Sequence, residues 1–303
     1  GPAGGQASAA PFPMRRGVNL GNALEAPSEG EWGYRIEDAH LGAIADAGFD
    51  GVRLPVRWDA HADARGKIEP AFMDRVAHVV DTAIARGLIV QLDGHHYQEL
   101  YDHPDAQLER AMRMWIDINE RFKDTAVERL LFEPMNEPNG EVMTADALGR
   151  LQSAADSAAW TANRARVVVH GPPNWNNIDA LNGWAPPQPL ERPAAVTVHY
   201  YEPHAFTHQG AEWLGAEAPT FDRDWGTAAD RRQVRDHITA AARWGRSHGA
   251  MMQLGEYGVN SAVPVQQRAM WTRAVREACE AEGMGWCVWD FAGAFPIWDR
   301  ERS

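Results

Sequence analysis

The sequence predicts an α/β fold, a (β/α)8 TIM barrel, from three observations. Short apolar segments recur along the 303 residues, and helical segments lie between them. Several of these apolar segments follow a glycine that ends the preceding helix, as at Gly48, Gly87 and Gly249. Near-continuous apolar strands that alternate with helices form a parallel sheet buried on both faces, and eight such units close into a barrel. The eight predicted strands are 16–22, 49–56, 88–95, 130–136, 166–171, 195–201, 250–256 and 285–291.

The helices between the strands are predicted from apolar residues that recur three and four positions apart. Phe72, Val76 and Val79 begin one such stripe, and Leu148 and Leu151 begin another. No Gly-x-Gly-x-x-Gly pattern follows the first predicted strand. Its absence there argues against a dinucleotide-binding fold.

One barrel domain is expected over residues 14–303, because no linker interrupts them. Residues 1–13, which begin Gly-Pro-Ala-Gly-Gly, are interpreted as the remnant of a cleavage site followed by a flexible linker. They contain no signal peptide, but we expect the natural protein to be secreted or periplasmic. The segment 205–232 carries Trp213 and Trp225 and is long enough to form a loop over the barrel mouth.

The composition excludes several kinds of partner. A net charge of −13 argues against nucleic acid and against an anionic membrane surface, and no apolar run approaches the roughly 18 residues of a membrane span. The 13 tryptophans supply both core residues and flat faces on which sugar rings can stack. Cys279 and Cys287 do not form a disulfide framework, and we expect two buried thiols. We expect a monomer.

Two predicted strands end in a carboxylate. The apolar segment 131–136 ends in Asn136 and is followed directly by Glu137 and a proline, and the apolar segment 251–255 is followed by Glu256. The carboxyl ends of barrel strands carry the functional residues of this fold. Two carboxyl groups brought together are what glycoside cleavage requires, one to protonate the leaving oxygen and one to attack or stabilise the anomeric carbon.

Polar residues also fall at the ends of most other predicted strands. Arg53 lies inside the apolar segment 52–56, and a guanidinium buried there needs an anion. The remaining strand-end candidates are Asn19, Asn22, Glu25, His95, His96, Asn174, Trp175, His199, Tyr201 and Trp289.

Strand alternation separates these candidates from their neighbours. Glu133, Met135 and Glu137 should share one facing, with Glu133 too deep in the barrel to reach substrate and held in a buried ion pair. The adjacent His95 and His96 should point to opposite faces of their strand. We therefore predict no metal site, and no cofactor.

With these residues in this order, the chain resembles glycoside hydrolase family 5, the cellulase family of barrel enzymes with catalytic glutamates on the fourth and seventh strands. Six motifs carry the resemblance in the family's order and cover most of the domain. They are Gly-Val-Asn-Leu-Gly-Asn at 17–22, Val-Arg-Leu-Pro-Val at 52–56, Asp-Gly-His-His at 93–96, Asn-Glu-Pro at 136–138, His-Tyr-Tyr at 199–201 and Leu-Gly-Glu-Tyr-Gly at 254–258. Residues 206–213, with Asn22 and Glu25, resemble a subgroup of bacterial endoglucanases, some of which also accept mannan.

The resemblance implies a retaining endo-β-1,4-glucanase that acts on cellulose or mixed-linkage β-glucan by double displacement. Glu137 matches the acid/base, with a pKa raised by the charge of the nucleophile, and Glu256 matches the nucleophile, kept ionised by Arg53 and Tyr201. Asn136 is expected to bind the sugar 2-hydroxyl, and His199 to orient Glu137. The residues implied in substrate binding are Asn22, Glu25, His95, His96, Trp175, His208, Trp213 and Trp289.

Other readings stay open at this stage. Within glycosidases these are an endo-β-1,4-mannanase or a bifunctional glucanase and mannanase, and then an enzyme for β-1,3-glucan. A barrel that binds glycans without cutting them would be expected to lack one glutamate or Arg53, and neither is missing. A metal-dependent hydrolase would need a His-x-His pair after the first strand, where the chain has Asn19-Leu20-Gly21-Asn22.

Overall fold

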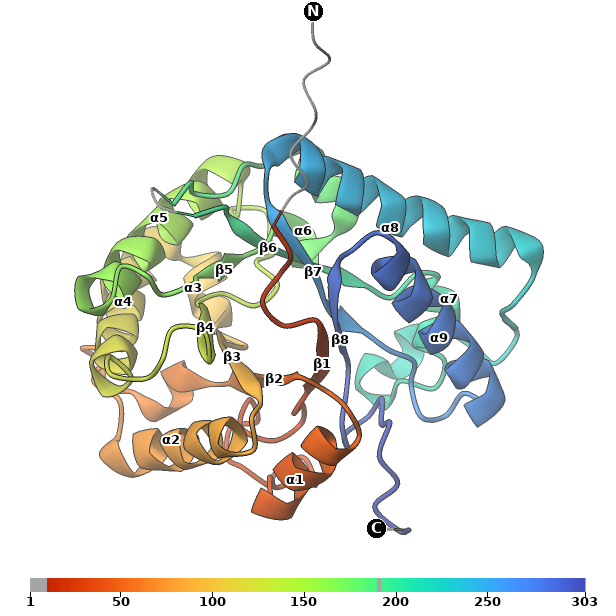
Figure 1. Ribbon diagram of the computed structural model, residues 1–303, viewed down its shortest axis with the longest axis horizontal. Coiled ribbons are helices and arrows are strands. Elements are labelled where there is room, and N and C mark those ends of the chain that lie inside the picture. The colour runs from red at the N-terminus through yellow and green to blue at the C-terminus, as the bar shows by residue number, and fades with distance from the viewer. Residues whose placement is uncertain (1–9, 190–191, 303) are drawn as a thin grey trace, which may run out of the picture.

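The computed structural model describes residues 10–189 and 192–302, and it contains eight parallel strands surrounded by helices (Figure 1). Hydrogen bonds join the strands in the order β4-β3-β2-β1-β8-β7-β6-β5. A bridge between Phe132 and Val168 places β4 beside β5, so the sheet closes. The predicted TIM barrel is confirmed. The strands are β1 (Arg16–Asn19), β2 (Gly51–Val56), β3 (Ile89–Gly94), β4 (Leu130–Glu133), β5 (Val169–His170), β6 (Ala195–Tyr200), β7 (Met251–Tyr257) and β8 (Gly285–Val288).

The helices form the outer layer of the barrel (Figure 1). The longest, α8, shows why such a segment is helical. The Thr227 hydroxyl accepts from the Asp230 backbone N–H at 3.1 Å, the Asp230 carboxylate accepts from the Thr227 N–H at 2.9 Å, and Gly249 ends the helix at φ 62°. The α-helices are α1 (Asp38–Asp46), α2 (Pro70–Ala85), α3 (Gln98–Asp102), α4 (Pro104–Arg121), α5 (Ala145–Ala162), α6 (Pro173–Asn176), α7 (His204–Thr207), α8 (Ala228–His248) and α9 (Val265–Ala281). Short 3₁₀ turns lie at Trp58–His61, Ile178–Gly183 and Glu212–Glu217.

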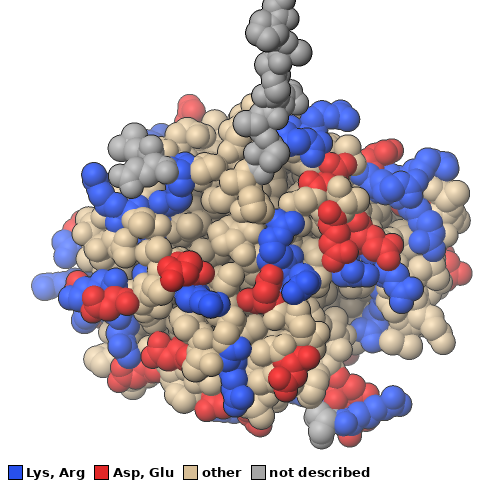
Figure 2. Space-filling model, in the orientation of Figure 1, with Lys and Arg blue, Asp and Glu red and all other residues tan. Residues whose placement is uncertain are grey.

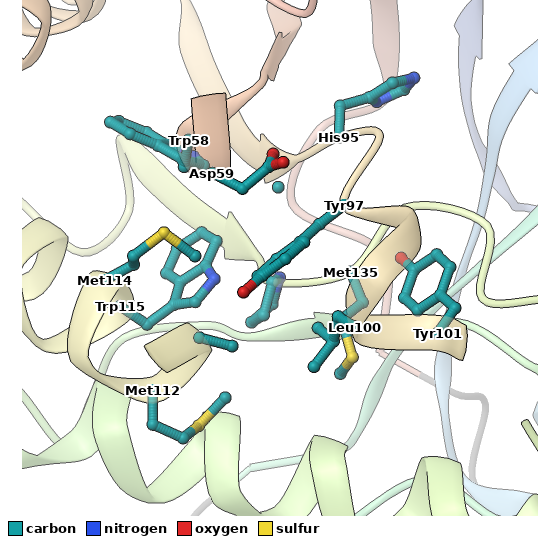
Figure 3. Close-up of a pocket in the computed structure, with 13 residues that line it drawn as sticks. Trp58, Asp59, His95, Tyr97, Leu100, Tyr101, Met112, Met114, Trp115 and Met135 are labelled. Carbon is teal, nitrogen blue, oxygen red and sulfur yellow. The ribbon is translucent and has the colours of Figure 1, made fainter. Parts of the chain in front are cut away.

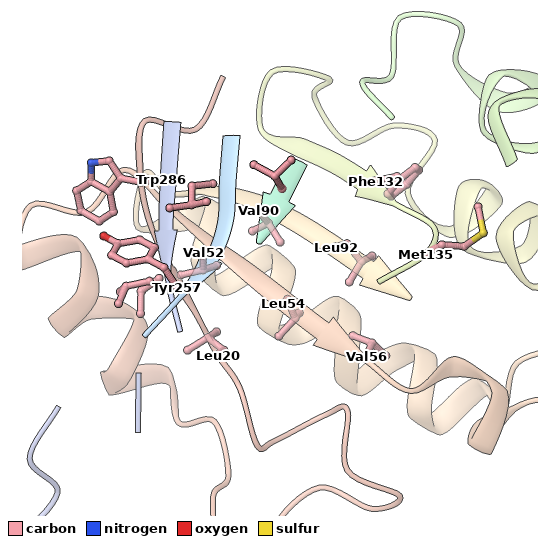
Figure 4. Packing of buried hydrophobic residues seen from close by; sticks show 14 of the residues in the cluster. Leu20, Val52, Leu54, Val56, Val90, Leu92, Phe132, Met135, Tyr257 and Trp286 are labelled. Atoms are coloured by element: carbon pink, nitrogen blue, oxygen red, sulfur yellow. The ribbon is translucent and has the colours of Figure 1, made fainter. Parts of the chain in front are cut away.

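The main core lies between the strands and the helices. Val52, Leu54 and Val56 of β2 are fully buried in it, together with side chains of β3, β4 and β8 (Figure 4). Because successive side chains of a strand point to opposite faces, Arg53 points into the barrel. The same alternation that builds the core therefore places a charged residue at the barrel axis.

A smaller apolar cluster fills the barrel at the amino ends of the strands. Phe12 and Met14 insert there beside Leu131 and Cys287. Phe12 lies within the predicted linker 1–13. Because its side chain is buried in this cluster, the folded domain includes residues before 14. The part of that linker from 1 to 9 lies outside the described residues.

Cys279 and Cys287 are free and buried, which confirms the prediction of two buried thiols. Within the described ranges, no helix combines the length and the apolarity that crossing a membrane would take. On the face seen in Figure 2, acidic and basic side chains are interspersed. That face carries no continuous basic surface.

Candidate active site

A cleft of about 970 Å³ opens at the carboxyl ends of the strands. Tyr201, which follows β6, lines this cleft, and so does Trp213 of the predicted insert 205–232. Trp225 of the same insert is buried instead, 6.5 Å from the ring of Phe206. The other predicted site residues that line the cleft are Asn22, Glu25, His95, His96, Glu137, Asn174, Trp175, His199, His208, Glu256 and Trp289.

Glu256 lies on β7, where two features of the chain place its carboxylate. The residue before it must be small, because a Cβ on Gly255 would lie 2.2 Å from the Thr197 hydroxyl. A register shift in β6 sets His199 opposite Glu256. The carboxylate then accepts hydrogen bonds from Arg53 Nη1 and from the Tyr201 hydroxyl, both at 2.8 Å.

Glu137 lies beyond the end of β4, in an unusual backbone conformation. Its φ is 47°, in the left-handed region that costs free energy for a residue with a side chain. Its backbone N–H donates to Asn176 Oδ1 at 3.0 Å, and Asn176 Nδ2 donates to the Pro172 carbonyl at 2.9 Å. The segment after β5 thus holds the turn that presents Glu137 to the cleft.

Both carboxyl groups approach the same nitrogen of His199. Its Nδ1 is 3.6 Å from Glu137 Oε1 and 3.5 Å from Glu256 Oε2. Burial lowers the pKa of His199, although the charge of Glu256 opposes this shift, so the ring is neutral. The Glu137 side chain is 23% exposed to the cleft, whereas that of Glu256 is only 4% exposed.

Burial raises the pKa of both Glu137 and Glu256 to about 7. For Glu137 burial is the largest cause and the charges of Glu133 and Asp93 add to it, whereas we had predicted the charge of Glu256 as the cause. The two pKa values are equal and do not show which carboxyl group loses its proton first, but the contacts of the two groups do. Glu256 accepts from a guanidinium and a hydroxyl, while among the described residues only His199 approaches the Glu137 carboxyl as a partner. The first negative charge on the pair therefore settles on Glu256.

Arg53 is the centre of the polar network in the barrel. Its Nε and Nη2 bind Glu133 at 2.8 and 2.9 Å, Nη2 also reaches Asp93 and Asn136 Oδ1 at 2.8 and 2.7 Å, and Nη1 binds Glu256. Three carboxylates thus share one fully buried guanidinium. The deep, ion-paired position predicted for Glu133 is confirmed.

The pKa values of the carboxyl groups around Arg53 shift in different directions. Burial raises the pKa of Asp93 well above its ordinary value. Burial acts in the same direction on Glu133, but the Arg53 guanidinium outweighs it and lowers the pKa of that carboxyl. Glu133 is therefore the carboxyl group that Arg53 holds most firmly in its ionised form, while Nη1 of the same guanidinium binds Glu256.

Asn136 is held from three sides. Its Oδ1 accepts from Arg53, its Nδ2 lies 3.2 Å from His95 Nε2, and its carbonyl accepts from the Tyr101 hydroxyl. Because the amide nitrogen can only donate, His95 Nε2 accepts and Nδ1 carries the proton toward Asp93, 3.0 Å away. Both ring nitrogens of His95 are thus engaged with protein, which makes His95 a support for Asn136.

The prediction that His95 and His96 point to opposite faces of their strand is wrong. His95 and His96 both line the cleft, with ring centroids 4.5 Å apart, because β3 ends at Gly94 and His96 has a φ of 58°. Met135 departs from the alternation as well. It is buried among helix side chains and does not share the facing of Glu133 and Glu137.

Four tryptophans are among the residues that line the cleft. Trp289 lies parallel to the His95 ring, with centroids 5.8 Å apart. Trp175 and Trp213 are 55% and 57% exposed, as platforms for a ring ligand would be. Trp32, which is 41% exposed and lines the same cleft, was missed, because its segment has no periodic pattern.

Glu25 holds a loop of the cleft. Its side chain is fully buried, and its two carboxylate oxygens accept the backbone N–H groups of Asn22 and Ala23. Burial raises its pKa to about 8. The structure therefore gives Glu25 a role in fixing Asn22, whose φ is 64° and whose side chain faces the cleft.

A second cavity, of about 20 Å³, lies behind His95 (Figure 3). It has room for about one water molecule and none for a sugar. His95 forms the wall between this cavity and the cleft. The other residues drawn around the cavity, among them Trp58, Tyr97, Leu100, Met112, Met114, Trp115 and Met135, are mostly apolar.

Within the part of the chain that the structure describes, one group of three side chains could hold a metal ion. Glu137, His199 and Glu256 each offer one ligand atom within 4.8 Å of the others. Two of these side chains are the carboxylate pair described above, and the third is the histidine that contacts both of them. No group with the pattern of a cofactor site was predicted from the sequence.

The sequence model of the family Cellulase (glycosyl hydrolase family 5) matches residues 10–294. The chain belongs to this family. The resemblance identified from six sequence motifs is confirmed, and the cleft at the carboxyl ends of the barrel strands is the cleft of a family 5 domain.

Relatives within and near the family include several endoglucanases. Endoglucanase H of Acetivibrio thermocellus is 33% identical over 300 residues, which are 97% of this chain and 31% of that protein. A hyperthermophilic endo-β-1,4-glucanase solved with substrate is 35% identical, with a TM-score of 0.91 over 95% of this chain and 92% of that one. Cel5A of Thermotoga maritima, solved with cellobiose and with mannotriose, is 34% identical, with a TM-score of 0.91 over 96% of this chain and 94% of that one. The chain spans about a third of the length of the first curated relatives, 31% and 35%.

Proposed function

We propose that this family 5 domain is a retaining endo-β-1,4-glucanase of cellulose or mixed-linkage β-glucan, with Glu137 as acid/base and Glu256 as nucleophile. One observation carries the proposal. A carboxylate oxygen of Glu137 and one of Glu256 lie within 4.8 Å of each other. Retaining enzymes hold their two carboxyl groups about 5–5.5 Å apart, whereas inverting enzymes leave about 6.5–9.5 Å for a water molecule.

The reaction has two steps. Glu256 attacks the anomeric carbon while the glycosidic C–O bond breaks and Glu137 gives its proton to the leaving oxygen. Water then attacks the same carbon, its proton passes to Glu137, and the bond to Glu256 breaks, so the sugar keeps its original configuration. Asn136, held by Arg53 and His95, is placed to bind the sugar 2-hydroxyl.

A second candidate is mannan hydrolysis in the same cleft. The observation that favours it is that Cel5A of Thermotoga maritima, 34% identical to this chain, has been solved with mannotriose as well as with cellobiose. Mannose and glucose differ at C2, next to the bond that is cut. Asn136 and its support His95 are therefore the residues on which the choice depends.

The substrate class is tested with carboxymethylcellulose, lichenan, xyloglucan, mannan and laminarin, followed by sizing of the products. We expect reducing ends from carboxymethylcellulose and lichenan, with mixed-length products early in the reaction. Faster release of reducing ends from mannan than from the glucans would favour mannan hydrolysis. Binding without release of reducing ends from any of the five polymers would leave a non-catalytic glycan-binding barrel.

The pH profile follows from the protonation of the pair. We expect kcat/KM to be bell-shaped, with limbs on either side of about 7. The rate rises with pH as the first proton leaves and Glu256 becomes ionised, and it falls as Glu137 loses the second. Initial rates on a soluble glucan across the pH range of the folded protein measure both limbs.

The variant Glu137→Gln tests the assignment of the alkaline limb. With an activated aryl cellobioside, whose leaving group needs no proton, this variant should lose that limb; a limb that persists belongs to another group.

The same variant should also change how the free energy of unfolding depends on pH. Folding raises the pKa of Glu137 from 4.5 to about 7, so the folded state holds the extra proton and loses stability as pH rises through that window. The amide variant should be free of this loss.

A further inference from the structure

A group of buried polar atoms surrounds Nε2 of His199, the ring nitrogen that does not face the two catalytic carboxyl groups. These atoms lie around the position that a Cβ on Gly255 would take. Thr197 Oγ1 is 2.2 Å from that position, and Gln253 Oε1 and His199 Nε2 are each 3.3 Å from it. Thr197 Oγ1 and His199 Nε2 are both buried, and neither makes a hydrogen bond to a described residue. Two such atoms beside one point indicate a shared hydrogen-bond partner.

A glycine at an irregular point of the sheet makes room for this group. Val198 of β6 pairs with Leu254 of β7. The next residue of β6, His199, pairs with Glu256, so Gly255 has no Cα partner on β6. Gly255 also has no side chain, and a Cβ there would clash with the polar atoms around it. The space beside this bulge is therefore taken by polar side chains of the barrel interior.

The two carboxyl groups determine which nitrogen of His199 carries the proton. Nδ1 lies 3.6 Å from Glu137 Oε1 and 3.5 Å from Glu256 Oε2. At least one of these groups is ionised in the working enzyme, and a nitrogen lone pair would be repelled by a carboxylate. Nδ1 therefore carries the proton. Because burial keeps the ring neutral, Nε2 has a lone pair and needs a hydrogen-bond donor.

Thr197 can supply that donor. Gln253 Oε1 can only accept, and it already accepts from Gln91 Nε2 at 3.0 Å, so the Thr197 hydroxyl is the one donor among the three polar atoms. Thr197 Oγ1 and His199 Nε2 are at most about 5.5 Å apart, because they lie 2.2 and 3.3 Å from one point. Two hydrogen bonds of about 2.8 Å each span that distance. One water molecule can thus accept from the hydroxyl and donate to Nε2 and to Gln253 Oε1, the three bonds that buried water typically makes.

We propose that Thr197 is a positioning residue of the active site, whose hydroxyl acts through one buried water molecule to keep Nε2 of His199 an acceptor and Nδ1 a donor. The consequence for the reaction rests on the proposed function. In the first step Glu256 forms its bond to the anomeric carbon, and Glu137 gives its proton to the leaving oxygen. The negative charge of the pair thereby moves from Glu256 to Glu137. The Nδ1–H, at nearly equal distance from both groups, stabilises that charge before and after the step.

Nitrogen NMR of the full chain, with isotope-labelled histidine, tests the placement of Thr197 without any need for activity. The signals of His199 are those that His199→Asn lacks, and at a pH where Glu256 is ionised we expect Nδ1 to be protonated and Nε2 to accept a hydrogen bond. Thr197→Val keeps nearly the same shape but has no hydroxyl, so it should move the Nε2 signal downfield, toward that of a nitrogen without a donor. Thr197→Ser should restore the signal. Thr161→Val, which removes a hydroxyl from the outer helix α5, is the matched control and should leave His199 unchanged.

Initial rates on lichenan test the consequence for the reaction. Thr197→Val should lower kcat about tenfold with little change in KM, because it weakens a hydrogen bond that acts on the charge of the pair, and Thr197→Ser should recover most of the rate. A proton on Nε2 in the unmodified chain, or the same His199 signals in Thr197→Val, would overturn the placement of Thr197. Altered signals with an unchanged kcat would overturn the task of the Nδ1–H. If the unmodified chain cleaves no glucan or mannan, the proposed function fails, while the His199 signals still decide whether Thr197 holds the ring.

Discussion

Replacing Glu256 with Gln is expected to lower kcat on a soluble glucan by at least about 1,000-fold. The amide has nearly the same shape, so it can occupy the site between Arg53 and Tyr201, but it cannot form the bond to the anomeric carbon that the first step requires. Initial rates on lichenan, with circular dichroism to verify the fold, measure the effect. A variant that keeps most of its activity would remove Glu256 from the reaction.

Azide separates the roles of the two glutamates. In Glu256→Gly the small anion can enter the vacated space and attack an activated aryl cellobioside directly, and the glycosyl azide formed should have inverted configuration. In Glu137→Gly azide should attack the glycosyl-enzyme instead and give a product of retained configuration. Glu133→Gly is the matched control, because this carboxylate is fully buried in an ion pair. Rescue by azide at Glu133 would show that the catalytic assignment is wrong.

The residues that could be predicted from the sequence are those fixed by the regular strands. Glu256 lies within β7, and the apolar run before it suffices to place it near the carboxyl end of that strand, whereas its facing depends on a register shift that gives it a different side from the core residue Leu254. Arg53 could be predicted as ion-paired for a similar reason, since a guanidinium between Val52 and Leu54 has no solvent to face. Alternation and the cost of burying charge are local rules, and they hold where a strand is regular, as β2 is around Arg53.

The rules fail where the chain leaves the strands. Asn22, His96, Glu137, Asn174 and Trp175 all have φ between 47° and 64°. A residue in that region breaks the alternation of side-chain facings along the chain. His96 has this conformation, and its side chain therefore lies in the cleft together with that of His95. Asn and His adopt this conformation more often than other residues with side chains, but few of them do so, and none of the five is a glycine that would mark the turn. The conformation depends on contacts from other segments, such as the one Asn176 makes with Glu137.

Two residues of the site, Asp93 and Trp32, were not predicted from the sequence for a different reason. Asp93 was part of a motif, but its effect comes from sharing Arg53 with Glu133, a contact across three strands. Trp32 lies in a loop without periodicity, and only the folded structure shows that it is exposed at the cleft. Long-range charge sharing and loop placement are set by tertiary packing, so a single sequence does not reveal them.

Replacing Arg53 with Met is expected to damage both stability and activity. It leaves the carboxyl groups of Asp93, Glu133 and Glu256 without their shared cation, and breaking a buried ion pair from one side costs about 3–5 kcal/mol. Asn136 loses the donor that holds its side-chain oxygen, and Glu256 loses the contact that favours its ionised form. We therefore expect kcat/KM to fall about 100- to 1,000-fold, as when one preorganised donor is removed from an active site. Urea unfolding and initial rates measure the two effects.

Arg166→Met provides the matched control that separates the two effects of Arg53. Arg166 is also buried, but it lies at the amino ends of the strands, and its hydrogen bonds to the described residues go to backbone carbonyls, including those of Phe122 and Leu130. Its removal should cost stability, about 1–3 kcal/mol for each carbonyl left without a partner, while kcat stays near the unmodified value. Arg53→Met should lower kcat even at temperatures where it is fully folded. If both variants lose activity only in proportion to the fraction unfolded, Arg53 supports the barrel without acting on the carboxylate pair. If only Arg53→Met loses kcat while folded, the guanidinium sets the charge of Glu256 and the position of Asn136, which the three-carboxylate network requires of it.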